Sequence, residues 1–186
     1  MTDPATVLSQ RVSHRSQSEE KSCSYVVSRI DRQYYALPLG HVIRAIRMVA
    51  VTPVPDVPHW VLGIINLSGQ MVPVIDLRQL FGQASKPLEL KDVLLIVQTS
   101  GQTVAIVVDE ALTILKFASE QVQSPPTTVS QSRFVAAAVQ HQGMLVLVLD
   151  ELRLFPNNNE KMADGLIWPE IPPLDGGKDD NAELTR

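Results

Sequence analysis

The chain has 186 residues, and 45% of them are hydrophobic, which is enough for one full core. Its formal net charge is −4. Residues 24–155 hold ten basic and ten acidic residues, whereas residues 156–186 hold three basic and seven acidic ones and carry the whole imbalance. A neutral body argues against nucleic-acid binding, which needs a basic face to replace counterions.

The cysteine content and the hydropathy pattern indicate a compartment. A single cysteine, Cys23, excludes an internal disulfide and is typical of a reducing environment. No apolar stretch approaches the roughly 20 residues needed to cross a bilayer. Residues 1–20 lack the apolar region of a secretory signal. We therefore expect a cytoplasmic protein with no direct membrane contact.

The two ends of the chain differ from its middle in composition. Residues 1–23 are rich in Ser, Gln and charge, which predicts a mobile N-terminal tail. Residues 156–186 begin with Pro and three Asn and continue with Asp, Gly and Pro clusters, which predicts an acidic C-terminal tail. The folded body is therefore predicted to span residues 24–155.

Short runs rich in Val, Ile and Leu fill this body, separated by polar turns that often contain Gly. Such runs and turns are typical of β-hairpins. The predicted strands, in chain order, are 24–30, 34–39, 42–47, 61–67, 71–75, 93–98, 103–108, 112–116, 135–140 and 144–149. Two short helical turns are predicted at 77–82 and 151–155. Asp76 and Asp150 precede them as N-caps, because a carboxylate there can accept bonds from free backbone N–H groups.

One pattern occurs twice, 74 positions apart, at residues 60–81 and 134–155. In each copy an apolar run meets a Gly, an Asp follows seven residues later, and a Phe follows five residues after the Asp. A weaker echo links residues 35–39 to 104–108. Repetition of this kind indicates two copies of one folding unit.

The repeat therefore predicts an all-β fold of two five-stranded barrels, related by an approximate two-fold axis. The halves are placed at roughly 24–90 and 91–155. In this arrangement Gly69 is equivalent to Gly143, and Asp76 to Asp150.

Residues that could support catalysis or metal binding are scattered. The histidines have no metal-ligand spacing, Cys23 has no CxxC partner, and no phosphate-binding loop or nucleophile elbow is present. Asp109 and Glu110 are interpreted as a cap or a solvated turn, and Ser68 as a turn residue. We expect no cofactor and no metal. The favoured class is a non-enzymatic binding module; a hydrolase using Ser68 is an alternative that needs a histidine and a carboxylate at the same turn. The histidines are His14, His41, His59 and His141.

Several segments resemble the CheW-like domain family. Residues 58–69, PHWVLGIINLSG, are similar to its central signature, and the resemblance covers roughly residues 24–155. The other matching segments are residues 35–39, Val42, and residues 51–55, 72–77, 107–110 and 145–150.

The resemblance implies two five-stranded SH3-like barrels and a non-catalytic adaptor role in bacterial chemosensory signal transduction. Proteins of this family couple chemoreceptors to a CheA-type histidine kinase. They bind the kinase's regulatory domain end to end and the receptor's cytoplasmic tip in a groove between barrels; other CheW-like domains are further candidate partners. The matched partner-binding positions are Val42, Arg44, Gly63, Asn66, Leu67, Ser68 and Gly69.

Two of these positions depart from the family pattern. Arg44 stands where Glu is usual, and Ser68 stands where Arg is usual. One interpretation is drift on an exposed rim that Val42, Arg44, Asn66 and Ser68 share. The other is a divergent array or pathway subunit with altered partner choice, because rim charges set specificity and association rate. An acidic partner surface, or the acidic C-terminal tail, would complement the basic residues of this region.

Overall fold

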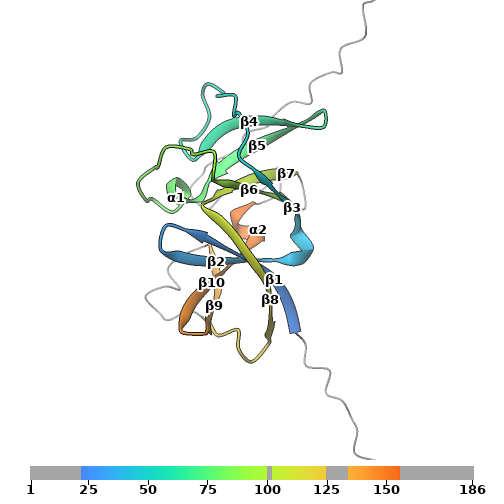
Figure 1. Cartoon of the computed structure of the whole chain (residues 1–186), viewed down its shortest axis with the longest axis vertical. Helices are drawn as coiled ribbons and strands as arrows, with labels where there is room; N and C mark the ends of the chain where they lie inside the picture. The colour runs from blue at the N-terminus through green and yellow to red at the C-terminus, as the bar shows by residue number, and fades with distance from the viewer. Residues whose placement is uncertain (1–21, 100–101, 125–133, 156–186) are drawn as a thin grey trace, which may run out of the picture.

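The computed structural model describes residues 22–99, 102–124 and 134–155 (Figure 1). Within these residues the chain forms ten strands, two one-turn α-helices and a short 3-10 turn, η2. The elements in chain order are β1 (Ser22–Ile30), β2 (Gln33–Pro38), η2 (Leu39–His41), β3 (Val42–Arg47), β4 (Val61–Leu67), β5 (Gln70–Asp76), α1 (Leu77–Leu80), β6 (Val93–Gln98), β7 (Thr103–Val108), β8 (Glu110–Ala118), β9 (Val135–His141), β10 (Met144–Leu149) and α2 (Glu151–Leu154).

The strands form two five-stranded sheets, one above the other along the long axis of the molecule (Figure 1). Sheet A has the order β8-β1-β2-β10-β9, and sheet B the order β3-β6-β7-β5-β4. In each sheet an isolated bridge joins the segment after one edge strand to the opposite edge strand: Thr52, after β3, pairs with Ile64 of β4, and Gln123, after β8, pairs with Ala138 of β9. The predicted all-β fold of two five-stranded subdomains is confirmed.

Each predicted strand is present, with differences of up to two residues at its ends. β1 begins at Ser22, so the predicted N-terminal tail of residues 1–23 is too long by two residues. Residues 1–21 and 156–186, which hold the rest of the predicted tails, lie outside the described residues.

The internal repeat extends over all ten strands. An offset of 74 relates β4, β5 and α1 to β9, β10 and α2, and an offset of 69 relates β1, β2 and β3 to β6, β7 and β8. The parallel pairs show the match directly, because Val148 lies opposite Ala36 in sheet A and Val74 lies opposite Ala105 in sheet B. The weaker echo in the sequence therefore marks equivalent strands, like the stronger one.

The predicted division into barrels at 24–90 and 91–155 is wrong. Sheet A takes β1 and β2 from the first half and β8, β9 and β10 from the second, and sheet B takes the remaining strands. The chain passes from sheet A to sheet B between β2 and β3, and back between β7 and β8. The contiguous halves are repeat units that exchange strands. The sequence did not predict this exchange, because an apolar pattern specifies which face of a strand is buried but not which strand pairs with it.

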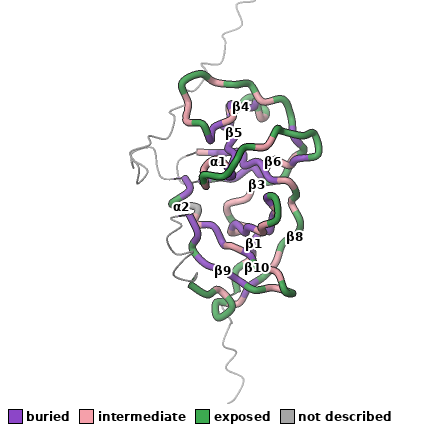
Figure 2. The backbone as a smooth tube through the Cα atoms, turned by 90° about the vertical axis from the view of Figure 1, so that its left-hand side faces the viewer, coloured by how far each residue is buried: buried purple, intermediate pink, exposed green. Residues whose placement is uncertain are grey.

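A core cluster of both sheets and both helices lies between the two sheets. Trp60, Leu77, Leu154 and Phe155 are fully buried in it. Each sheet also has an internal cluster of its own, and the buried stretches follow the strands through the body (Figure 2). Burying one such large apolar side chain contributes about 1.5–3 kcal/mol. The shared core therefore fixes the two sheets against each other and sets the geometry of the surface where the chain crosses between them.

Candidate partner-binding surface

The turn between β4 and β5 carries four of the candidate residues. Ser68 and Gly69 have φ values of 55° and 88°, so both central residues are in the left-handed region, as in a type I′ turn. Asn66 Oδ1 accepts a hydrogen bond of 2.8 Å from the Gly69 N–H. Asn66, Ser68 and Gly69 are exposed, and Leu67 is half-buried. The turn chemistry predicted for Ser68 is present, on a hairpin tip that a partner can reach.

Gly63 is buried and has a structural role. Its φ is 141°, and a Cβ atom there would lie 2.2 Å from the Thr52 carbonyl oxygen. The close approach lets Thr52 and Ile64 exchange two backbone hydrogen bonds of 2.9 Å. Gly63 thus permits the bridge between the segment after β3 and the edge strand β4, and its contact with a partner stays a prediction.

β3 holds the remaining two candidates, Val42 and Arg44. A β-bulge lies between them, because the register shifts from Val42 opposite Val97 to Arg44 opposite Ile96. The extra residue, Ile43, is 55% exposed. The hairpin tip and β3 belong to the same sheet. Whether Val42 and Arg44 form one rim with Asn66 and Ser68 stays a prediction.

The repeat places the same bulge in β8. There the register shifts between Val27 and Ser28 and leaves Leu112 as the extra residue, which is 40% exposed. Ile114, in the same strand, is 54% exposed. Each strand that follows a crossing between sheets therefore presents apolar side chains to solvent. Ile43 and Leu112 are related by the offset of 69, which is also the offset of the weaker echo between residues 35–39 and 104–108.

β8 pairs with β1, and η2, which leads into β3, also contacts β1. Figure 1 shows both strands where the chain passes between the sheets. We name the large apolar and the basic residues that are exposed on these strands the crossover surface. Within the described residues its cations form no ion pair. The crossover surface consists of Ile43, Arg44, Arg47, Leu112, Ile114 and Lys116.

Asp76 and Asp150 occupy equivalent places before the two helices. Asp76 Oδ1 accepts a bond of 2.9 Å from the Arg78 N–H, and Asp150 Oδ1 accepts one of 3.2 Å from the Arg153 N–H. The backbone N–H of Asp76 bonds to the Trp60 carbonyl oxygen, and that of Asp150 bonds to the Phe134 carbonyl oxygen, each at 2.9 Å. Both aspartates therefore satisfy the first backbone donors of their helices.

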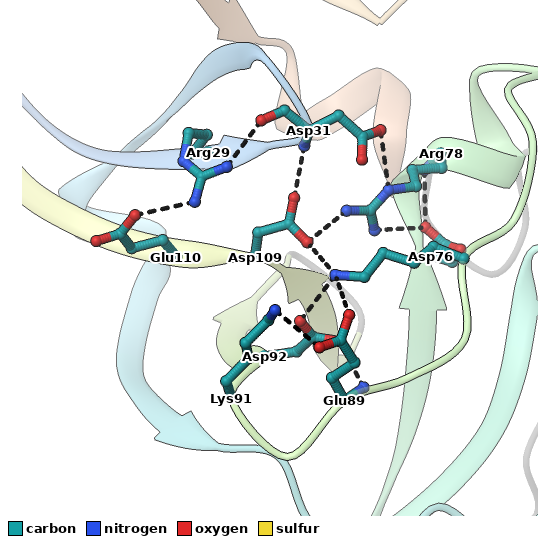
Figure 3. A network of polar contacts seen from close by, with 10 residues as sticks. Arg29, Asp31, Asp76, Arg78, Glu89, Lys91, Asp92, Asp109 and Glu110 are labelled. Carbon is teal, nitrogen blue, oxygen red and sulfur yellow. Dashed lines mark hydrogen bonds and ion pairs between the residues drawn. The ribbon is translucent and has the colours of Figure 1, made fainter.

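A charged network that the sequence did not reveal lies beside the β7–β8 crossing (Figure 3). The Arg78 guanidinium is 3% exposed and donates to Asp31 Oδ2 at 3.1 Å and to Asp109 Oδ1 at 2.6 Å. Lys86 Nζ donates to Asp109 Oδ1 at 2.7 Å and to Asp92 Oδ1 at 3.1 Å. The network joins the β1–β2 turn of sheet A to α1 and to the segment before β6, so it fastens the two sheets together.

The network shifts the pKa values of its members. Burial by itself would raise the pKa of Asp109, but bonds from Lys86, the Asp31 N–H and Arg78 hold it at about 2. Hydrogen bonding to Asp109 raises the pKa of Lys86 against the effect of burial. A depression of about 630 Å³ lies beside these groups. Most of the charged side chains that line this depression form ion pairs with one another or with nearby side chains. We therefore interpret the depression as part of a structural network and not as a ligand site. Asp109 was expected to be a cap or a solvated turn residue. In the structure it accepts bonds from Arg78, Lys86 and the Asp31 N–H and is a member of the network.

The hydrolase alternative needs a histidine and a carboxylate at the Ser68 turn. Within the described residues, the Ser68 hydroxyl has no hydrogen bond to a histidine or a carboxylate. His141 lies in sheet A, whereas Ser68 lies in sheet B. Cys23 is exposed in β1. In the part of the chain that the structure describes, no three His, Cys, Asp or Glu side chains gather to hold a metal ion, and no helix is long and apolar enough to span a bilayer.

Comparisons with known proteins agree with this arrangement. A family model described as CheW-like domain matches residues 24–158. The chemotaxis protein CheW of Rhizobium meliloti (strain 1021) is 26% identical over 124 residues, covering 65% of this chain and 80% of that protein. Protein PilI of Pseudomonas aeruginosa is 25% identical over 146 residues, covering 69% and 82%. The crystal structure of the scaffolding protein TtCheW from Thermoanaerobacter tengcongensis superposes with a TM-score of 0.68 at 25% identity, covering 76% of this chain and 97% of that one.

Proposed function

Since this chain belongs to the CheW-like domain family, we propose that it is a cytoplasmic, non-catalytic adaptor that couples chemoreceptors to a CheA-type histidine kinase. The crossover surface is the observation that carries the proposal. Ile43, Leu112 and Ile114 expose apolar area on two strands that a shared core holds in place. Grouped exposed apolar side chains are typical of sites that bind other proteins.

Two parts of the molecule suit two kinds of partner. The crossover surface suits the helical tip of a receptor, because exposed apolar side chains can accept the apolar face of a helix. The hairpin of residues 66–69 lies at the end of β4 and β5, where a second barrel can dock end to end. A kinase regulatory domain of the same family is the expected occupant of this second site.

Binding assays with a receptor cytoplasmic tip and a kinase regulatory domain test this division. Ile43→Glu and Leu112→Glu should each weaken receptor-tip binding by about tenfold or more, because each places a charge where the bound receptor would cover an apolar side chain. Leu90→Glu is the matched control, since Leu90 is 85% exposed and lies outside this surface. Equal effects of all three changes, or none, would remove the crossover surface as the receptor site.

A second candidate is an array or pathway subunit with altered partner choice, and Arg44 and Ser68 favour it. Arg44 is exposed on β3, and Ser68 is exposed at the hairpin tip. Reversion of both, Arg44→Glu with Ser68→Arg, should raise the association rate with a standard kinase regulatory domain or receptor tip, and the gain should shrink at high salt. Identical kinetics for native and reverted proteins would mean that the two positions are neutral.

A further inference from the structure

The side chains of β3 divide between two faces, and the pairing of β3 with β6 assigns each one. Residues directly opposite each other in an antiparallel pair lie on the same face of the sheet. Ala45 lies opposite Leu95, which belongs to the core cluster between the sheets. Arg47 lies opposite Val93, which packs against that cluster. Ala45 and Arg47 are therefore exposed on the face of β3 that borders the shared core.

The repeat places matching residues on β8. The offset of 69 gives Ala45 and Arg47 the counterparts Ile114 and Lys116. Ile114 lies opposite Val26, which packs against the cluster between the sheets. Lys116 is two residues further along the same strand and so lies on the same face, and both side chains are exposed. Each strand therefore presents one apolar residue and one cation on the side of the shared core.

Apolar residues at the start of each strand connect these positions to the core. Val42 and Ala111, which the offset of 69 also relates, are half-buried and pack against the cluster between the sheets. From the region between the sheets, β3 runs upward and β8 runs downward (Figure 1). The surface thus has an apolar centre and a cation toward each end. We name it the intersheet face; its exposed residues are Ala45, Arg47, Ile114 and Lys116.

The positive charge of the intersheet face is local. Within the described residues, neither Arg47 nor Lys116 forms an ion pair. Arg44 is not part of this face, because it lies opposite Ile96 in the internal cluster of sheet B. Residues 24–155 hold equal numbers of basic and acidic residues, so the body as a whole does not attract a polyanion. The two cations therefore favour a partner with acidic groups at two defined places.

The form of β3 and β8 indicates which kind of element binds there. Both are edge strands, and an edge strand can bind a partner by pairing with a further strand. Each carries a bulge near its start and an exposed cation, however, and both features protect an edge against such pairing. Recognition therefore depends on side chains. An amphipathic helix presents an apolar stripe with charged flanks and suits this requirement.

From these observations we propose that Arg47 and Lys116 determine the specificity of the intersheet face, and that its partner is a helical surface with an apolar centre and acidic side chains on both flanks. Ile114 and Ala45 contact the apolar centre, and the two cations contact the acidic flanks. The identification of this partner with a receptor tip rests on the proposed function. The charge preference rests on the strand register and the charges alone.

Two synthetic antiparallel helical hairpins test the charge preference on the full chain. They share one apolar stripe and differ only in the residues that flank it, Glu in one hairpin and Lys in the other. Fluorescence anisotropy of the labelled hairpins should show that the Glu hairpin binds about tenfold more tightly at low salt, and the difference should shrink at high salt. Arg47→Glu and Lys116→Glu should each reduce this preference by about threefold, and the double variant should abolish it.

Arg32→Glu is the matched control. Arg32 is also an exposed cation without an ion pair within the described residues, but it lies in the turn between β1 and β2. This variant should keep the preference of the native protein. Equal binding of the two hairpins, binding of neither, or a preference that survives in the double variant would overturn the proposal.

A receptor cytoplasmic tip, measured in the same assay, separates this inference from the proposed function. Preferential binding of the Glu hairpin without binding of the receptor tip would contradict the proposed function and support the charge preference. Binding of the receptor tip together with equal binding of the two hairpins would overturn the charge preference and leave the proposed function standing.

Discussion

Gly63 and Gly69 have left-handed backbone conformations for different reasons. A Cβ atom at Gly63 would lie 2.2 Å from the Thr52 carbonyl oxygen, whereas a Cβ atom at Gly69 would meet nothing within 4 Å. Gly69→Ala should therefore cost only about 1 kcal/mol of backbone strain. Gly63→Ala adds a backbone clash and should cost more than about 3 kcal/mol. Denaturant unfolding of both variants checks the difference; equal losses would contradict the close approach at Thr52.

Asp109 gives the stability of the protein a dependence on pH. Its folded pKa of about 2 lies below the ordinary value of 3.8. A lowered pKa means that the stabilisation is complete above about pH 4 and is lost as the pH falls toward 2. Asp109→Asn should reduce the free energy of unfolding at neutral pH by about 2 kcal/mol and flatten its fall between pH 4 and 2.

The neighbouring Glu110 provides the control for this measurement. It pairs with Arg29 at 3.1 Å, and both side chains are substantially exposed. Glu110→Gln should therefore lower stability by less than about 1 kcal/mol. A steep acid limb that survives in Asp109→Asn would assign the pH dependence to other carboxylates.

At the scale of elements, the two equivalent helices differ in what surrounds their caps. The Asp150 side chain is 22% exposed, so Asp150→Ala should cost about 1 kcal/mol. The Asp76 side chain is 2% exposed and lies 3.7 Å from Arg78 Nη1. Asp76→Ala removes a cap and a buried countercharge, and should cost about 2–4 kcal/mol. Thermal melts of both variants measure this, with Asp76→Asn as a control that keeps the capping oxygen; similar costs at Asp76 and Asp150 would contradict a role for Arg78.

The elements themselves could be predicted because their signals are local. Strands, two-residue turns and caps each depend on a few neighbouring residues, such as Ser68 with Gly69. The Arg78 network could not be predicted, since its partners come from four separate segments and no sequence spacing links them. The bulges at Ile43 and Leu112 could not be predicted either, because a bulge is a feature of strand pairing, and the repeat does not say which strands pair.

At the scale of the whole molecule, strand exchange makes the two sheets depend on each other. Each sheet contains strands from both halves of the chain, and the central cluster draws side chains from both sheets. The sequence repeat correctly predicted two copies of one unit. It could not show whether each copy forms its own sheet or whether the two copies exchange strands. Both alternatives bury the same faces and satisfy the same backbone groups.

Cutting the chain between residues 90 and 91 tests this dependence. The fragment 1–90 lacks the strands that pair with β3 and with the outer edges of β1 and β2, namely β6, β8 and β10. Unpaired strands and a divided core cannot offset the entropy of ordering, so neither fragment should fold alone. Mixing fragments 1–90 and 91–186 should restore the β-sheet circular dichroism signal and one cooperative thermal transition. A matched cut within the segment 125–133 leaves sheet B whole and should permit partial folding of the larger fragment. Cooperative melting of fragment 1–90 by itself would show that the exchange is dispensable for folding.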